Sequence, residues 1–274
     1  MSGLDLDAYL ARIGYSGPRT ATLATLEALA ALHPQAIPFE NLDVLLQRPI
    51  RLDLGALSEK LVQQRRGGYC FEQNGLLQAA LAALGFTVRS LAARVEWGNG
   101  DDVTLRPRTH MVLLVSLPAG DYIVDAGFGG LTLTAPLKRE LGVTQSTPHA
   151  DFRLADVDGE LRLEAKTAGD WSPVYLVSMQ EQGAADWDVV NWYTSTHPQS
   201  IFINSLIAAR SLEDRRLALL NNELRIYRTD GTSERRELAT AEELETVLSD
   251  AFGIALPDGA RARLQALIPA SKVR

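Results

Sequence analysis

The amino-acid sequence predicts an α+β fold in which helices come first, strands second and a mixed segment third. Three observations lead to this class. Apolar residues recur at helical spacing through residues 1–85, and from Phe86 onward they gather in short runs rich in Val, Ile and Leu. Two Asp-Gly pairs, Asp158-Gly159 and Asp230-Gly231, lie where alternating segments can fold back as hairpins. Because strands and helices do not alternate regularly, a parallel βαβ sheet is disfavoured.

The helical segment contains four candidate helices, at residues 4–13, 21–32, 54–64 and 70–84. Asp53 can cap the third helix, and Gly67 and Gly68 would end it. Gly85 is a stop signal for the fourth. All four are therefore expected to lie before the first strand.

The remaining elements follow from the same patterns. Candidate strands cover residues 86–97, 111–117, 122–125 and 171–179, and a hairpin covers 152–165. After residue 200, a second hairpin covers 223–236, and Thr240 can cap a helix over 241–251 that ends at Gly253. These segments supply the second and third parts of the predicted fold.

Composition bounds the function. The 274 residues are 46% hydrophobic and 22% charged, as in a soluble globular protein, and the net charge of -7 disfavours nucleic acid as a partner. No secretory signal and no membrane-spanning run is evident, so we expect a cytoplasmic protein without a membrane partner. One cysteine excludes an internal disulfide, and with four scattered histidines it gives no metal-ligand spacing, so no metal is expected.

Cys70 is a candidate nucleophile because of its place in the chain. It follows the Gly67-Gly68 turn and begins a predicted helix. A helix N-terminus offers unpaired N–H groups and the positive end of the dipole, which favour the thiolate and can stabilise an oxyanion. A buried structural cysteine is an equally good interpretation of this segment by itself.

A cysteine nucleophile needs a base and an orienting partner. His33, His149 and His197 each lie beside a proline and are interpreted as structural or solvent-facing. His110 begins a strand that is apolar on both faces, and Asp125 ends the next strand. Residue parity across the hairpin places the two side chains on one face. A turn over residues 118–121 would set Asp125 opposite Leu114, whereas a turn centred nearer 117.5 would set it opposite His110. The alternative is a His–Asp pair that only fixes the hairpin.

Five ordered stretches together resemble the arylamine N-acetyltransferases. The matching residues are Ile37-Pro38-Phe39-Glu40-Asn41-Leu42, Arg66-Gly67-Gly68-Tyr69-Cys70-Phe71-Glu72-Gln73-Asn74, Thr109-His110-Met111, Val124-Asp125-Ala126-Gly127-Phe128-Gly129, and Asn191-Trp192-Tyr193 through Ser200-Ile201-Phe202. They cover most of residues 35–205, whereas the last 70 residues match less distinctly.

The resemblance implies a fold and a reaction. The fold would have a helical domain at 1–85, a β-barrel-like domain at 86–200 and an α/β lid domain at 201–274, with a core like that of papain-type cysteine proteases. Cys70, His110 and Asp125 would form a catalytic triad. The enzyme would transfer acetyl from acetyl-CoA to arylamines, arylhydrazines or hydrazides in a ping-pong reaction through acetyl-cysteine, as in xenobiotic metabolism.

Candidate ligand contacts follow from the matched stretches. Phe39, Val95 and Phe128 are expected to contact the arylamine ring, with ordinary core packing as the alternative. Gly127, Gly129 and Gly130 would let backbone N–H groups approach the CoA pantetheine or pyrophosphate, unless they only form a tight turn. The resemblance also implies CoA contacts at Trp97, Thr109, Phe128 and Phe202. Arg65 and Arg66 can form salt bridges with nearby carboxylates and are assigned no catalytic role.

Three other functions fit the same residues. An amide synthase that closes macrocyclic polyketides would carry the same triad but need a carrier-bound donor. A cysteine hydrolase or transglutaminase-like enzyme would differ in whether water or an amine discharges the acyl-enzyme. A non-catalytic binding module is the least favoured, because all three triad positions hold competent residues.

Overall fold

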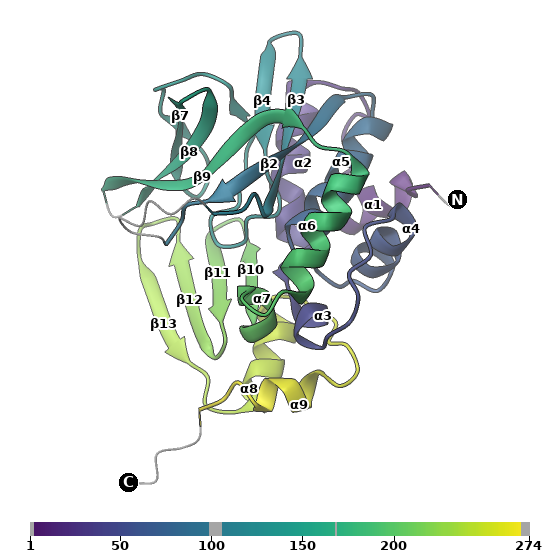
Figure 1. Ribbon diagram of the computed structural model, residues 1–274, viewed down its shortest axis with the longest axis vertical. Coiled ribbons are helices and arrows are strands. Elements are labelled where there is room, and N and C mark those ends of the chain that lie inside the picture. Colours follow the sequence, from purple (N-terminus) through teal and green to yellow (C-terminus); the bar gives the residue numbers. More distant parts are fainter. Residues whose placement is uncertain (1–2, 99–105, 168, 270–274) are drawn as a thin grey trace.

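A computed structural model describes residues 3–98, 106–167 and 169–269, and it shows helices packed beside two antiparallel sheets (Figure 1). The predicted order of helices, strands and a mixed segment is confirmed. The helices before the first long strand are α1 (Leu6–Ile13), α2 (Leu23–Ala36), α3 (Leu42–Leu45), α4 (Leu54–Leu57), the π-helix η1 (Ser58–Gln63) and α5 (Cys70–Ala83).

The helix ends follow local chemistry. Asp53 caps α4 as predicted, since its carboxylate accepts from the Ala56 N–H at 3.0 Å. Helix α2 runs to Ala36, four residues past the predicted end. Pro34 lies in its last turn and removes one backbone donor, while the Ile37 N–H still bonds the His33 carbonyl.

An eight-stranded sheet forms a nearly closed barrel. Its strand order is β5-β4-β3-β2-β9-β8-β7-β6, and every pairing is antiparallel. The side chain of Gln145 on β6 accepts from the Lys138 N–H at 2.7 Å and donates to the Lys138 carbonyl at 2.8 Å, which joins the two edge strands. The strands are β2 (Thr87–Val95), β3 (His110–Leu117), β4 (Gly120–Val124), β5 (Leu137–Lys138), β6 (Gln145–Ser146), β7 (Asp151–Val157), β8 (Glu160–Thr167) and β9 (Asp170–Glu181).

The β3–β4 hairpin has a tighter turn than expected. Leu117 pairs with Gly120, so only Pro118 and Ala119 lie between the strands. Leu114 pairs with Ile123, and both registers that we considered for Asp125 are therefore wrong. Continued by two positions, the observed register sets Asp125 opposite Val112, on the same face as His110. The parity prediction is confirmed, and the two side chains are diagonal neighbours.

The second sheet has the order β1-β10-β11-β12-β13 and is also antiparallel. The predicted hairpin around Asp230-Gly231 is its β12–β13 pair, whereas β1, β10 and β11 were not predicted individually. The strands are β1 (Phe39–Glu40), β10 (Ile207–Ser211), β11 (Arg215–Leu220), β12 (Glu223–Arg228) and β13 (Ser233–Glu237). The later helices are α6 (Ala184–Thr196), α7 (Ile201–Asn204), α8 (Ala241–Thr246), the π-helix η2 (Val247–Ala251) and α9 (Ala260–Gln265).

Asn41 connects the N-terminal helical segment to residues 202–207 near the start of the third segment. Its amide group donates to the Phe202 carbonyl at 2.7 Å and to the Ser205 carbonyl at 2.8 Å, and its side-chain oxygen accepts from the Ile207 N–H at 2.7 Å. Strand β1 continues this connection by pairing with β10. Phe39 and Glu40 are therefore part of the second sheet, and Asn41 is bonded to it, although all three precede β10 by more than 160 positions.

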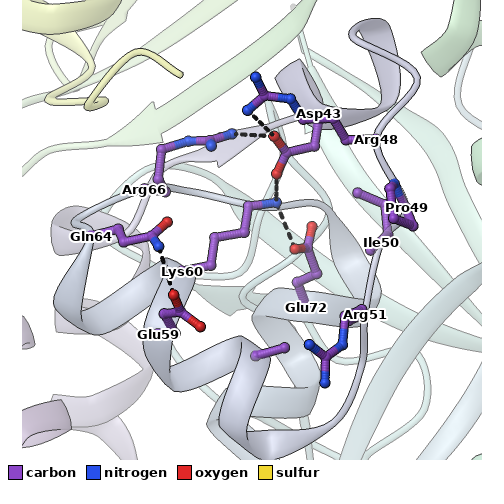
Figure 2. A pocket seen from close by; sticks show the side chains of 11 residues that line it. Asp43, Arg48, Pro49, Ile50, Arg51, Glu59, Lys60, Gln64, Arg66 and Glu72 are labelled. Carbon is purple, nitrogen blue, oxygen red and sulfur yellow. Dashed lines mark hydrogen bonds and ion pairs between the residues drawn. The ribbon is translucent and has the colours of Figure 1, made fainter. Parts of the chain in front are cut away.

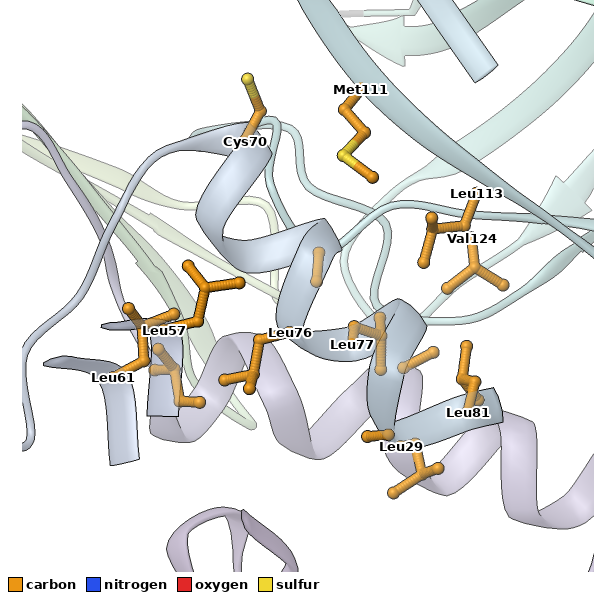
Figure 3. Close-up of a cluster of buried hydrophobic side chains, with 14 of the residues drawn as sticks. Leu29, Leu57, Leu61, Cys70, Leu76, Leu77, Leu81, Met111, Leu113 and Val124 are labelled. Carbon is orange, nitrogen blue, oxygen red and sulfur yellow. The ribbon is translucent and has the colours of Figure 1, made fainter. Parts of the chain in front are cut away.

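Strand β3 separates two buried clusters, because its side chains alternate between faces. Met111, Leu113 and Val115 pack against the helices, while Val112 and Leu114 point into the interior of the eight-stranded sheet. The helical side of the first cluster includes Leu76, Leu77 and Leu81 of α5, drawn with Met111 and Leu113 in Figure 3. This confirms a strand buried on both faces.

A chain of charged side chains lies near the N-terminal end of α5 (Figure 2). Arg66 contacts Glu40 at 2.8 Å and Asp43 at 3.1 Å, which confirms the ion pairing expected for Arg66. Lys60 contacts Asp43 at 2.8 Å and Glu72 at 2.7 Å. The charges thereby connect β1, α3, η1 and α5.

Candidate active site

Helix α5 begins at Cys70 because the preceding glycines pack closely. A Cβ on Gly67 would lie 2.1 Å from the Pro38 carbonyl oxygen, and a Cβ on Gly68 would lie 2.6 Å from a Glu72 carboxylate oxygen. With that space open, Glu72 reaches back and accepts from the Tyr69 N–H at 3.1 Å. This bond satisfies one N–H at the start of the helix.

Cys70 is the first residue of α5, as predicted, and is 4% exposed. Its sulfur lies 3.8 Å from the Thr109 carbonyl oxygen, just before β3. In Figure 3 the sulfur stands at the end of the helix and points away from the leucines that α5 buries. The thiol is therefore near the helix N-terminus and the beginning of the His110 strand.

His110 and Asp125 form a buried pair. His110 Nε2 lies 2.7 Å from Asp125 Oδ2, and the residues are 3% and 1% exposed. Cys70 adds to the electrostatic environment of the imidazole, and Nδ1 is the ring nitrogen that does not contact Asp125. Burial by itself would lower the pKa of His110, but the Asp125 carboxylate, with a further contribution from Cys70, raises it to about 10.

Asp125 is held by three donors. Asn74 Nδ2 donates to Oδ1 at 2.9 Å and the Gly127 N–H donates to the same oxygen at 2.8 Å, while His110 occupies Oδ2. Burial would raise the pKa of Asp125, yet His110 and these donors hold it below its usual value. The carboxylate is therefore kept ionised inside the protein.

Sequence reasoning gave Asn74 no role. Its amide also donates to the Met111 carbonyl at 2.7 Å and accepts from the Ala126 N–H at 2.9 Å, so it joins α5 to β3 and to the end of β4. The sequence feature that could have indicated Asn74 is its position four residues after Cys70, one turn along the same face of the helix.

Tyr175 on β9 was also missed. Its ring centroid lies 5.1 Å from that of His110 and 5.3 Å from that of Phe128. Burial, together with the charge of Asp125, raises the pKa of Tyr175 well above its usual value. The pattern along β9 marks Tyr175 as inward-facing, but nothing in the sequence indicates that β9 pairs with β2.

The predicted ring contacts lie in two aromatic groups. Phe128 meets His110 edge to face at 5.2 Å, and Val95 lies across the β2–β9 pairing from Tyr175. Phe39 belongs to the second group, in which its ring centroid lies 6.1 Å from that of Phe202. Phe202 also contacts Tyr69, the residue before Cys70, at 5.8 Å.

The glycine-containing loop after β4 differs from our expectation. A Cβ on Gly127 would lie 2.7 Å from Cys70 Cα, so this residue allows the loop to touch α5. The Gly127 N–H bonds Asp125 and the Gly129 N–H bonds the Thr132 hydroxyl at 2.8 Å. Two of the three expected donors are therefore engaged within the protein. Gly130 is exposed, and its hypothetical Cβ would lie 4.0 Å from Ala218.

Two of the predicted CoA contacts lie near the ends of strands. Trp97 follows β2 and is 41% exposed. Its backbone N–H donates to the Val174 carbonyl at 3.0 Å. Thr109 precedes β3 and presents its carbonyl to Cys70.

The other three histidines have partners or positions of their own. His33 is fully buried between Tyr9 and Gln73, at 2.9 and 2.8 Å. His149 contacts the Thr134 hydroxyl at 2.9 Å, and His197 follows the last residue of α6. Within residues 3–98, 106–167 and 169–269, no cluster of three or more His, Cys, Asp or Glu is arranged to hold a metal.

Comparisons with known proteins agree with this geometry. A family model described as N-acetyltransferase matches residues 22–261. The arylamine N-acetyltransferase of Mycobacterium tuberculosis is 45% identical over 270 residues, which span 97% of this chain and 95% of the relative. The chain belongs to the arylamine N-acetyltransferase family. It is therefore an acyltransferase.

Other members of the family resemble the chain over nearly their whole length. The Escherichia coli arylamine N-acetyltransferase is 41% identical, over 92% of this chain and 90% of the relative. The Mycobacterium marinum enzyme solved in complex with CoA superimposes with a TM-score of 0.92 at 43% identity, covering 96% of this chain and 98% of that one. Among the residues described, no helix is long and apolar enough to cross a membrane.

Proposed function

We propose that this chain transfers an acetyl group from acetyl-CoA to an arylamine, arylhydrazine or hydrazide through an acetyl-cysteine intermediate on Cys70. One observation carries the proposal. Cys70 stands at a helix N-terminus and its sulfur lies 3.8 Å from the carbonyl oxygen of Thr109, the residue before His110, whose Nε2 lies 2.7 Å from the buried carboxylate of Asp125. Nucleophile, base and orienting group are thus connected in series.

In the first half-reaction, Cys70 Sγ attacks the carbonyl carbon of the thioester and its proton passes to His110. Asp125 stabilises the resulting imidazolium. N–H groups at the start of α5 are suited to the oxyanion of the tetrahedral intermediate. When that intermediate collapses, the bond from carbon to the CoA sulfur breaks, and CoA leaves as a thiol with the proton from His110.

In the second half-reaction, the amine attacks the acetyl-cysteine. Arylamines and hydrazides are weakly basic, so they are neutral and nucleophilic near neutral pH. His110 takes the proton released as the amide forms and returns it to the Cys70 sulfur. Water must be kept from the thioester, and the 4% exposure of Cys70 supports such exclusion.

The ligand contacts remain part of the proposal. The Mycobacterium marinum enzyme binds CoA in its solved complex, and we extend CoA binding to this chain by similarity. Trp97, Thr109, Gly127, Phe128, Gly129, Gly130 and Phe202 are proposed to border the donor, and Phe39, Val95 and Phe128 the acceptor ring. The division at residues 85 and 200, the papain-like core, the cytoplasmic location and the role in xenobiotic metabolism stay predictions.

The proposal is tested by intact mass. The purified chain is incubated with acetyl-CoA without acceptor, beside Cys70→Ser. We expect one acetyl group on the wild-type chain, none on the variant, and its loss when an arylamine is added. Absence of the adduct while Cys70 still reacts with iodoacetamide would overturn acetyl-CoA as the donor. Discharge by water as fast as by the amine would indicate a hydrolase instead.

A further inference from the structure

Lys60 connects a surface cavity to the helix that carries Cys70. Its ammonium group lies 2.7 Å from Glu72 Oε1 and 2.8 Å from Asp43 Oδ2, and its side chain is 15% exposed. Figure 2 shows Lys60 reaching between these two carboxylates from η1. The cavity beside it has a volume of about 250 Å³ and is lined by residues that include Arg48, Ile50 and Glu59.

Each carboxylate oxygen of Glu72 has a different partner. Oε1 contacts Lys60, whereas Oε2 accepts from the Tyr69 N–H at the start of α5. The Glu72 side chain is only 3% exposed and lies two residues from Cys70. A negative charge on Glu72 without a positive partner would disfavour a thiolate on Cys70. The Tyr69 side chain does not replace Glu72 as the cap of α5.

We propose that Lys60 is a positioning residue that neutralises Glu72 and holds it as the cap of the Cys70 helix, and thereby maintains the reactive thiolate. This inference rests on the proposed role of Cys70 as the nucleophile. Lys60 acts through Glu72, since its ion-pair partners are Asp43 and Glu72 rather than Cys70 or His110.

The other charged side chains near Lys60 and Glu72 also have ion-pair partners. Asp43 is shared between Lys60 and Arg66, and Arg66 in turn holds Glu40. Burial would lower the pKa of Lys60, but Glu72, Glu40 and Asp43 raise it, so the ammonium stays charged. Burial raises the pKa of Glu72 even with Lys60 present. Without Lys60, Glu72 would either remain charged beside the thiolate or take up a proton and weaken its bond to the Tyr69 N–H.

Other groups face the two ends of this connection. Arg48, Arg51 and Glu59 line the cavity on the Lys60 side. On the far side of Cys70 stand His110 and Asp125. These groups stay in place when position 60 or 72 is substituted. A Lys60 substitution also removes one partner of Asp43, which keeps Arg66 at 3.1 Å.

The experiment measures the rate of iodoacetamide alkylation from pH 5 to pH 10, for which Cys70 is the only thiol. Lys60→Met should raise the pH midpoint by about one unit, which slows alkylation roughly tenfold below it. Glu72→Gln should move the midpoint the other way, and the double variant should lie near the wild type. Lys60→Arg should preserve the profile, because the adjoining cavity has room for a guanidinium.

Lys138→Met is the matched control, since Lys138 forms an exposed ion pair with Glu140 at 2.6 Å. Its profile should equal that of the wild type. A Lys60→Met chain that melts like Lys60→Arg but keeps the wild-type midpoint would overturn the proposal. Shifts of equal sign in Lys60→Met and Glu72→Gln would overturn it as well. Alkylation reports the thiolate without any acyl donor, so this outcome is distinguishable from a failure of acetyl transfer.

Discussion

The Asp125 carboxylate depends on neutral and charged donors together. His110, Asn74 and Gly127 supply one hydrogen bond each, from β3, α5 and the loop after β4. A carboxylate with this degree of burial is unstable as an anion unless such partners surround it. Removing its charge while keeping its shape should therefore affect both stability and the protonation of His110.

Asp125→Asn is expected to change how stability depends on pH. His110 has a folded pKa raised to about 10, against an unfolded value near 6.5. Its contribution is complete below pH 6.5 and is lost as the pH rises toward 10, at up to about 1.4 kcal/mol per pH unit. Asp125, whose pKa is lowered, contributes above about pH 4 and loses this contribution in acid.

Urea unfolding at pH 7, 8 and 9 measures this effect. Asp125→Asn should be about 3 kcal/mol less stable at pH 7, because it breaks a buried pair, and the gap should narrow as the pH rises. Two curves that stay parallel across this range would show that the charge of Asp125 does not set the pKa of His110.

Among the secondary-structure elements, those with local signals were predictable. Asp53 caps α4, Gly85 follows the end of α5, and Asp158-Gly159 and Asp230-Gly231 form the predicted hairpins. Helix α6 begins at Ala184 after the N-cap residue Gly183, which has no capping side chain, and this helix was missed. Strand β1 has two residues, and its partner lies on β10, so no local pattern reveals it.

The sequence indicated that Cys70, His110 and Asp125 belong to one site, but not their geometry and not the neighbours Asn74 and Tyr175. Parity placed His110 and Asp125 on one face, because side chains alternate along any strand. Their spacing depends on whether the β3–β4 turn holds two residues or four, and Pro118-Ala119-Gly120-Asp121 allows both. Tyr175 reaches the site through pairing between β2 and β9, which is set by tertiary packing.

The contact between the β4 loop and α5 gives a prediction at the level of elements. Gly127→Ala places a methyl group 2.7 Å from Cys70 Cα, and a helix backbone has little room to move. We expect a loss of about 1–3 kcal/mol in the free energy of unfolding. Acetylation of Cys70 by acetyl-CoA should slow about 100-fold, since the loop carries Asp125 away from its position.

Gly130→Ala provides the comparison for stability. Its new methyl group would meet Ala218 at an ordinary 4.0 Å. Its free energy of unfolding should stay within about 0.5 kcal/mol of the wild type. Equal stability of the two alanine variants would contradict the close contact at Gly127.

For the molecule as a whole, Asn41 connects segments that lie more than 160 positions apart. Asn41→Ala leaves the Phe202 and Ser205 carbonyls and the Ile207 N–H without their side-chain partner. We expect a loss of about 2–4 kcal/mol, measured as a lower urea midpoint, and faster cleavage by trypsin in the last 70 residues.

Asn204→Ala is the control, because Asn204 is exposed and its side-chain amide donates to the nearby Pro198 and Ser200 carbonyls, at 3.0 and 3.3 Å. Its urea midpoint should change little. If Asn41→Ala were no less stable than Asn204→Ala, the segments would be held together mainly by β1–β10 pairing and apolar packing.

The pairing of β1 with β10 also has a consequence for biosynthesis. Phe39 leaves the ribosome about 170 residues ahead of its partner Ala209. At a synthesis rate of 5–20 residues per second, the edge of β1 that pairs with β10 stays unpaired for roughly 10–30 seconds. The nascent chain therefore carries an open strand edge through most of translation, although Cys70, His110 and Asp125 have all been made. Full assembly of the sheet beside the candidate site must follow completion of β10.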